Sequence, residues 1–278
     1  MMNKTSLIRA LVVMAVLIPP VRAMAQSDDP EWLRNCRDDR GDRMDRRETY
    51  CDIRTATARP SGDAVSMEGL RNGGVQVTGW DRNEILIRTR IRAQARTQSE
   101  AKAIADQIRT VVNGSTITVD GPRNNSDDDD YNQWSASLVV SVPSRSNLRV
   151  ETRNGPVSVS QVKGDMNLQT RNGPMALYDL AGTVMARTTN GPLSISLAGS
   201  KWDGGGLDAR TTNGPLTISV PENYSAHLET GTTNGPVSLG FPVTVSGRIN
   251  RDISTDLGSG GATIRAMTTN GPLTLRRK

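Results

Sequence analysis

The sequence is poor in the residue types on which many catalytic, metal and nucleic-acid sites depend. Its 278 residues include one His, two Cys, four Trp, four Tyr and one Phe. A zinc site would lack the His and Cys ligands it needs, and single-stranded nucleic acid would lack aromatic side chains on which to stack. No apolar run reaches the length that crosses a bilayer. We therefore expect no metal, no other cofactor, no nucleic-acid partner and no transmembrane anchor.

The motifs of common catalytic sites are also missing. The one histidine, His227, falls at the polar phase of a strand pattern, and we interpret it as a solvated residue. The chain has no Gly-x-Ser-x-Gly nucleophile elbow, and Gly258–Gly261 lacks the Lys-Ser/Thr of a phosphate loop. Asp127–Asp130 is compatible with Ca²⁺ as an alternative, but its Ser/Asn-rich setting favours a solvated loop. We assign no catalytic, cofactor-binding or metal residue.

Met1–Ala25 has the organisation of a signal peptide. A basic start is followed by an apolar run over 10–18 and an A-x-A cleavage site at 23–25. The run is too short to span a bilayer, which weakens the alternative of an N-terminal membrane anchor. Cleavage removes three basic residues, so the net charge of +5 falls by three and gives little support to a nucleic-acid partner. We expect an exported protein, periplasmic or secreted.

The second half of the chain is built from a repeat. The triplet Asn-Gly-Pro recurs, with its asparagine at Asn154, Asn172, Asn190, Asn213, Asn234 and Asn270. The steps between these asparagines are 18, 18, 23, 21 and 36 residues. The basic unit is therefore 18 residues long, with two insertions and one double interval, and a fixed period of this size is typical of repeat architectures.

Each unit alternates apolar and polar side chains on both sides of its asparagine. In the first unit the apolar phase before the corner is Leu148, Val150 and Thr152, and after the corner it is Val157 and Val159. This alternation predicts a strand, an Asn-Gly-Pro corner and a second strand in every unit.

Two mainly β folds satisfy this pattern over residues 146–278. Asn-Gly between alternating runs is a strong hairpin signal, which would give an antiparallel β-meander. The alternative is a parallel β-solenoid in which each coil has about 18 residues. We favour the solenoid, because stacked coils align the same Asn and Thr into ladders, whereas a meander has no need of the same corner on every second turn. The six asparagines are then the repeat corners.

The N-terminal extension, residues 26–60, is dense in Asp and Arg. It contains both cysteines, Cys36 and Cys51, and two cysteines in an exported chain usually pair. We therefore expect a charged extension stapled by one disulfide.

Residues 61–145 are expected to hold strands and one helix that form an N-terminal cap. Short alternating runs predict strands at 65–70, 75–78, 85–91, 115–119 and 135–142. Thr97 begins a capping box with Glu100, and an apolar stripe continues to Val112, where Asn113-Gly114 is expected to stop the helix. We expect this stripe to pack on the first coils.

The segment Arg71–Glu84, the helix and the Thr-x-Asn-Gly-Pro units together resemble the bacterial exported β-strand-repeat proteins called "putative adhesins". The likeness covers roughly 51–278. It implies an exported repeat protein of undetermined function, and the family offers no catalytic or ligand residues to transfer onto these positions.

We hypothesise a non-enzymatic structural or adhesin-like interaction module at the cell envelope. Outward side chains such as Arg149, Glu151, Arg153, Arg171 and Thr189 are available to meet an envelope glycan or protein. The alternative is an envelope enzyme acting on polysaccharide, because stacked coils can carry paired acids. Its candidate acids are Asp127–Asp130, Asp179, Asp203 and Asp208.

We also expect the charged end of the chain, 276–278, to discourage addition of a further strand.

Overall fold

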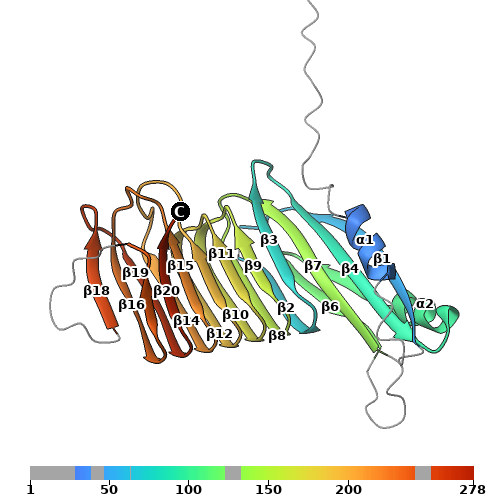
Figure 1. The fold of residues 1–278 in the computed structure, drawn as a ribbon. Coiled ribbons are helices and arrows are strands. Elements are labelled where there is room, and N and C mark those ends of the chain that lie inside the picture. Colours follow the sequence, from blue (N-terminus) through green and yellow to red (C-terminus); the bar gives the residue numbers. More distant parts are fainter. Residues whose placement is uncertain (1–28, 39–46, 63, 123–132, 242–251) are drawn as a thin grey trace, which may run out of the picture.

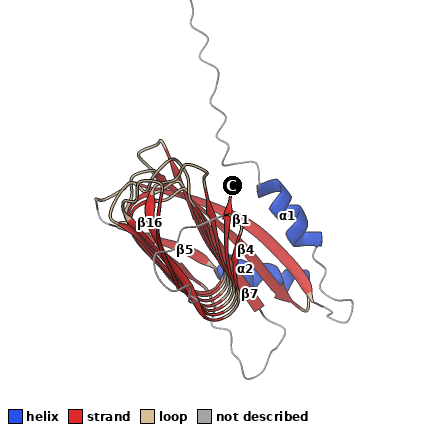
Figure 2. Cartoon of the chain, turned by 60° about the vertical axis from the view of Figure 1, so that its left-hand side comes forward, coloured by secondary structure: helices blue, strands red, loops and turns tan. Residues whose placement is uncertain are grey.

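The computed structural model describes residues 29–38, 47–62, 64–122, 133–241 and 252–278. Met1–Ala25 and Asp127–Asp130, for which the sequence predicts a signal peptide and a charged loop, lie outside the described residues. The described chain forms two ten-stranded sheets that face each other, with strands side by side along one axis (Figures 1 and 2). Neighbouring repeat strands are parallel and in register. The predicted parallel β-solenoid is therefore confirmed, and the antiparallel meander is wrong for the repeats.

Each coil contributes one strand to each sheet, and an Asn-Gly corner joins the two strands. The coils, in chain order, are β2 (Val65–Asn72) with β3 (Val75–Trp80), β8 (Leu148–Asn154) with β9 (Val157–Ser160), β10 (Lys163–Asn172) with β11 (Met175–Tyr178), β12 (Ala181–Asn190) with β13 (Leu193–Ser196), β14 (Gly206–Asn213) with β15 (Leu216–Val220), β16 (Ala226–Asn234) with β17 (Val237–Leu239), and β19 (Thr263–Asn270) with β20 (Leu273–Arg277). We call the sheet that contains β3 and β9 sheet A and the sheet that contains β2 and β8 sheet B.

The core lies between the two sheets. It is formed by every second side chain of each repeat strand, which points inward. Val150, Leu168 and Ala186 of sheet B meet Val159 and Leu177 of sheet A, and all are at most 3% exposed. Burying a large side chain contributes about 1.5–3 kcal/mol, while ordering the backbone costs about 1–2 kcal/mol per residue. A coil with so few apolar residues therefore depends on its neighbours.

The corner residues are selected by contacts between coils. The Asn172 side-chain amide donates to Oδ1 of Asn154 at 2.8 Å, and the buried Thr170 hydroxyl donates to the Gly155 carbonyl at 3.1 Å. A Cβ added to Gly173 would lie 2.2 Å from the oxygen of Gly155. Glycine follows each asparagine because the coils approach backbone to backbone there.

The order of the coils in space departs from their order in the chain. The last coil, β19 with β20, lies between β14–β15 and β16–β17. In the described residues of the 36-residue step before Asn270 there is thus no further coil. This step contains β18 (Asp252–Leu257), an antiparallel strand that covers β16 at the end of sheet B. The expectation that the charged end of the chain protects an edge strand is wrong, because β20 is flanked by β15 and β17.

The stack begins earlier than the Asn-Gly-Pro motif shows. β2 and β3 meet at Asn72-Gly73-Gly74, and Asn72 pairs with Asn154 in register. Gly74 takes the place of proline at this corner. The Asn-Gly-Pro pattern therefore excludes these strands from the repeats, and they were expected in the cap instead.

Antiparallel strands close the N-terminal end of the stack. β1 (Glu48–Ala58), β4 (Ile85–Ala95) and β7 (Gln133–Pro143) extend sheet A, and the hairpin β5 (Arg109–Asn113) with β6 (Thr116–Asp120) extends sheet B. Helix α2 (Gln98–Gln107) packs against β4 and β1. Ala105 and the C-cap residue Ile108 share a buried cluster with Ile91, Ala93 and Ala136.

The helix is shorter than the sequence predicts. Its capping box between Thr97 and Glu100 is present, but the helix ends at Gln107, and Val112 belongs to β5. β-Branched residues favour strands, and Asn113-Gly114 makes a hairpin turn.

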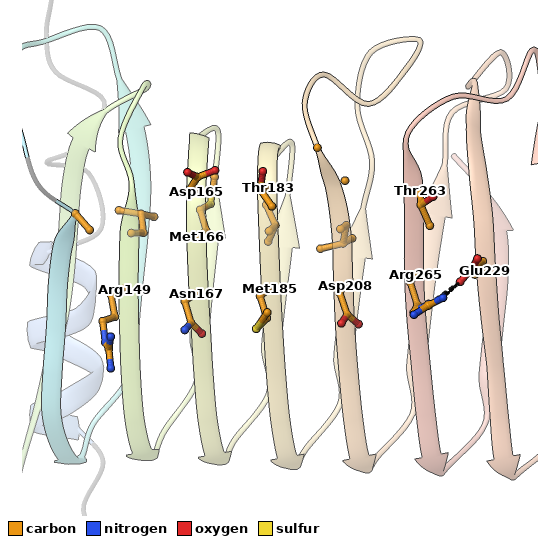
Figure 3. A pocket seen from close by; sticks show the side chains of 16 residues that line it. Arg149, Asp165, Met166, Asn167, Thr183, Met185, Asp208, Glu229, Thr263 and Arg265 are labelled. Atoms are coloured by element: carbon orange, nitrogen blue, oxygen red, sulfur yellow. Dashed lines mark hydrogen bonds and ion pairs between the residues drawn. The ribbon is translucent and has the colours of Figure 1, made fainter.

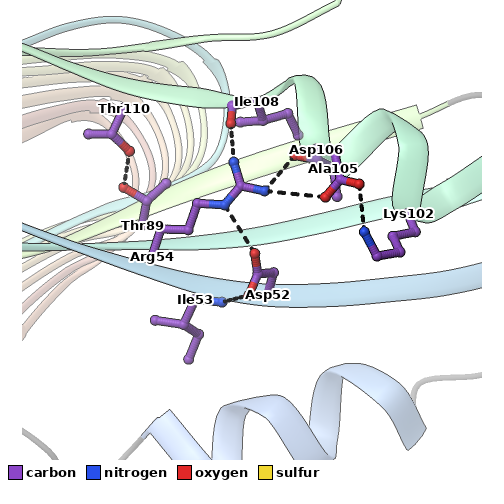
Figure 4. A network of polar contacts seen from close by, with 9 residues as sticks. All are labelled: Asp52, Ile53, Arg54, Thr89, Lys102, Ala105, Asp106, Ile108 and Thr110. Carbon is purple, nitrogen blue, oxygen red and sulfur yellow. Dashed lines mark hydrogen bonds and ion pairs between the residues drawn. The ribbon is translucent and has the colours of Figure 1, made fainter.

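Arg54 of β1 holds the end of this helix (Figure 4). Its guanidinium donates to the carbonyls of Ala105, at 2.9 Å, and Ile108. A cation at the C-terminus of a helix satisfies free carbonyls and complements the helix dipole.

The N-terminal extension contains a helix that the sequence analysis did not predict. α1 (Asp29–Asp38) lies on the outside of sheet A, where Asp29 binds Arg88 at 2.7 Å and Arg90 at 2.9 Å. Cys36 and Cys51 are joined by a disulfide that ties α1 to β1. These long-range contacts hold a segment whose own composition is mostly polar.

Candidate functional site

The outer face of sheet B carries rows of outward, mostly polar side chains. Because the strands are in register, residues at the same phase form rows across them. We call one such row the central row. It runs across β8, β10, β12, β14, β19 and β16 and consists of Arg149, Asn167, Met185, Asp208, Arg265 and Glu229 (Figure 3).

A shallow groove of ≈ 660 Å³ follows the central row. On one side it is bordered by Asp165, Thr183 and Thr263 (Figure 3), and at Gly205–Gly206 the absence of side chains deepens it. Met185 lies within the groove and is 41% exposed. The groove is also lined by Leu148, Met166, Val184 and Leu207, so it offers apolar surface beside its hydrogen-bonding groups.

Most charges on this face form ion pairs. Glu229 binds Arg265 at 2.5 Å, and Asp208 binds Arg210 at 2.9 Å and Arg187 at 3.5 Å. These pairs fix the side chains in place, although exposed pairs each contribute at most about 1 kcal/mol.

The acids that the sequence analysis considered for glycan cleavage are separated. Asp179 occupies a tight turn with φ 51°. Asp203 accepts a hydrogen bond from Lys163, which lowers the pKa of that carboxyl. Asp208 shares the groove with Glu229, but they stand two strands apart, about 9.5 Å, and Arg265 lies between them. A general acid is usually set in an apolar pocket, whereas these two carboxylates lie on an open face against guanidinium groups.

His227 lies on the outward, polar phase of β16 as predicted, and its partly exposed side chain has defined partners. Its Nδ1 lies 2.7 Å from Asp256 Oδ1, and its Nε2 lies 3.3 Å from the Ser254 hydroxyl. The imidazole thus lies between a carboxylate and a hydroxyl, as in a Ser-His-Asp triad. The sequence could not show this grouping, because β18 pairs antiparallel with β16 across a long insertion. Hydrolysis also requires oxyanion donors and a substrate pocket. The groove includes Glu229 but stops short of Ser254.

The described residues contain no group of three His, Cys, Asp or Glu side chains placed to hold a metal ion. Within the same ranges, no helix has the length and apolarity needed to cross a membrane.

The structure sorts the outward residues named from sequence into different rows. Arg149 belongs to the central row, whereas Arg153, Arg171 and Thr189 directly precede the corner asparagines. Sequence reasoning missed Asn167, Met185 and Arg265. Their shared outward phase within the repeat is the signal that could have found the first two, but the place of Arg265 depends on the order of the coils.

Comparison with known proteins gives one family match. The family model Toastrack DUF4097 matches residues 144–276. No curated protein matches the chain.

Several solved structures are similar to this chain. A "putative cell adhesion protein" from Clostridium sporogenes ATCC 15579 is 11% identical, with a TM-score of 0.47, over 82% of this chain and 100% of that chain. A "putative adhesin" from Bacteroides fragilis NCTC 9343 is 8% identical, with a TM-score of 0.35, over 82% and 97%. A "putative lipid binding protein" from Parabacteroides distasonis ATCC 8503 is 10% identical, with a TM-score of 0.30, over 81% and 96%.

Proposed function

Because residues 144–276 match the family model Toastrack DUF4097, we propose that the protein is an exported, non-enzymatic, adhesin-like module that binds an extended glycan of the cell envelope. The observation that carries the proposal is the groove along the central row of sheet B. It crosses six strands of the stack, so a linear polymer would lie along the solenoid axis.

The chemistry of the groove suits a sugar chain. Asn167, Thr183 and Thr263 supply hydrogen-bonding groups, and Met185 supplies an apolar surface for the carbon face of a ring. A protein partner would instead be anchored by aromatic or aliphatic side chains buried in deep pockets. The groove is open and shallow, and it combines apolar surface with hydrogen-bonding side chains, which favours the glycan.

Export is supported by the leader sequence at 1–25 and by the Cys36–Cys51 disulfide. Disulfides persist in oxidising compartments such as the periplasm or the cell exterior. We place the protein in one of these.

The binding experiment compares the two outer faces of one solenoid. In a glycan array and by calorimetry with the captured glycan, the variant Asn167→Ala/Met185→Ala should lose about tenfold in affinity, equivalent to 1.4 kcal/mol. Ser158→Ala/Ser194→Ala, which changes the outer face of sheet A, is the matched control and should bind like the unmodified protein. Capture of an envelope protein instead of a glycan, or equal binding by both variants, would contradict the proposal.

The non-enzymatic part has its own test at Ser254. The unmodified protein should hydrolyse p-nitrophenyl acetate no faster than Ser254→Ala. A rate that depends on both Ser254 and His227 would show that the arrangement on β16 and β18 is an active site.

A further inference from the structure

A second row on the outer face of sheet B is strongly basic at one end. It consists of the residues that directly precede the corner asparagines, and we call it the corner row. In the spatial order of the coils its members are Arg71, Arg153, Arg171, Thr189, Thr212, Thr269 and Thr233. All seven side chains are exposed. Three arginines thus stand on adjacent coils about 4.8 Å apart, followed by four threonines.

The three arginines differ from the other arginines of the repeat coils on this face. Arg149, Arg187, Arg210 and Arg265 each bind an acid. Among the residues that the structure describes, Arg71, Arg153 and Arg171 form neither an ion pair nor a side-chain hydrogen bond. Like charges on neighbouring strands are destabilising. Within the described chain, these three arginines therefore cost stability without a compensating contact.

The arginines also surround a hollow in the sheet. β2 carries a bulge between Met67 and Leu70, and this bulge places Gly69 beside Glu151, at a position where most other coils carry a long side chain. A Cβ added to Gly69 would meet no atom within 4 Å. The resulting hollow of ≈ 450 Å³ is lined by all three arginines and by Glu151.

We infer that the Arg71–Arg153–Arg171 end of the corner row binds the acidic groups of an anionic polysaccharide. Guanidinium groups bind carboxylate and phosphate with two parallel hydrogen bonds. The three arginines that line the hollow stand in a row, so acidic groups on successive sugars of one chain can bind them. The inference rests on the proposed function, because it names the charge class of the glycan bound at the groove on the same face.

A polymer explains the row better than a single ion does. One small anion meets at most two guanidinium groups spaced a strand apart, whereas a chain with repeated charges meets all three. The threonine hydroxyls then follow in line for the neutral part of the chain. Nucleic acid is disfavoured, because the seven residues of the row include no aromatic side chain for base stacking.

The experiment measures binding of an oligogalacturonate, which has one carboxylate per sugar, to the full mature protein. The same oligomer with its carboxylates methyl-esterified is the neutral control. Single changes of Arg71, Arg153 or Arg171 to Gln should each lower affinity about threefold to fivefold, and the triple variant about thirtyfold or more. Glu151→Gln should raise affinity, because it removes the one acid of the hollow.

Arg210→Gln is the matched protein control, since it removes the same charge from the same face but from a paired arginine. An equal loss in this variant would reduce the effect to net charge and overturn the inference. Equal binding of the methyl ester, or a preference for single-stranded DNA over the acidic oligomer, would also overturn the inference. If the groove variant Asn167→Ala/Met185→Ala binds normally while the arginine variants do not, the proposed groove fails and the anion site stands. If the arginine variants bind normally while the groove variant does not, the anion site is refuted and the proposed groove stands.

Discussion

Asn270 donates a 2.8 Å hydrogen bond from its side-chain amide to Oδ1 of Asn213, which lies 57 residues earlier in the chain. Asn234, which lies between them in sequence, donates instead to Asn270 at 2.9 Å. The asparagine ladder thus records the true order of the coils.

This order predicts which engineered cysteines cross-link. Asn213→Cys with Asn270→Cys should form a disulfide, because adjacent strands lie about 4.8 Å apart, within the usual Cα range of such bonds. Asn213→Cys with Asn234→Cys is the control and should stay reduced, since these coils lie two spacings apart. Non-reducing electrophoresis or mass mapping distinguishes the pairs, and the reverse result would show that the coils stack in chain order.

The corner glycines should resist substitution for a reason of space. Gly173→Ala would place a methyl group 2.2 Å from the Gly155 carbonyl oxygen, and separating two packed coils should cost about 3 kcal/mol or more. Gly199→Ala is the control, because open space surrounds that position and only its φ of 71° opposes alanine, at about 1 kcal/mol. Urea unfolding compares the two variants; equal costs would contradict close packing at the corner.

Asp29 should stabilise the end of the molecule that carries the helices. Arg88 and Arg90, whose side chains are 9% and 13% exposed, both bind it. Asp29→Ala would leave two largely buried guanidinium groups without their acid. We expect the free energy of unfolding to fall by about 3 kcal/mol or more. Glu31→Ala changes an exposed acid of the same helix turn and should be nearly neutral. Thermal unfolding measures both, and a neutral Asp29→Ala would show that α1 does not depend on this contact.

Tyr224 should make the protein sensitive to high pH. The residue is 3% exposed, and burial raises the pKa of its hydroxyl to about 12. An unfolded tyrosine ionises near pH 10. The free energy of unfolding is therefore unaffected by this group below about pH 10. It falls as the pH rises toward 12, by about 2–3 kcal/mol in all, because the unfolded tyrosine ionises first. Tyr224→Phe should lose less stability over that interval in urea titrations. Parallel pH curves for the two proteins would count against the buried hydroxyl.

The sequence was sufficient to predict the repeat architecture, because the physical requirement is local. Each unit repeats its own alternation of inward and outward residues, and the identical Asn-Gly-Pro corner needs a neighbour of its own kind. The preference for a parallel stack rests on the recurrence of this corner from unit to unit, and it requires no knowledge of contacts between distant segments.

What sequence could not predict depends on contacts between distant segments. Nothing in the sequence near Asn234 indicates that the coil of Asn270 lies between the coil of Asn234 and the coil of Asn213. α1 depends on arginines of β4, and the grouping of Ser254 with His227 depends on an antiparallel pair. The hollow at Gly69 likewise arises from a bulge that shifts register between two strands.

The placement of the last coil between two earlier ones has a consequence for biogenesis. A solenoid that stacks in chain order can add each coil as it leaves the ribosome, N-terminal end first. Here the strands of 226–239 emerge before the coil on which they must rest. If they docked at once on the coil of Asn213, they would take the place of residues 263–277. Completion of the stack therefore waits for the final residues, a timing that suits a chain delivered unfolded across a membrane and assembled only when all of it has arrived.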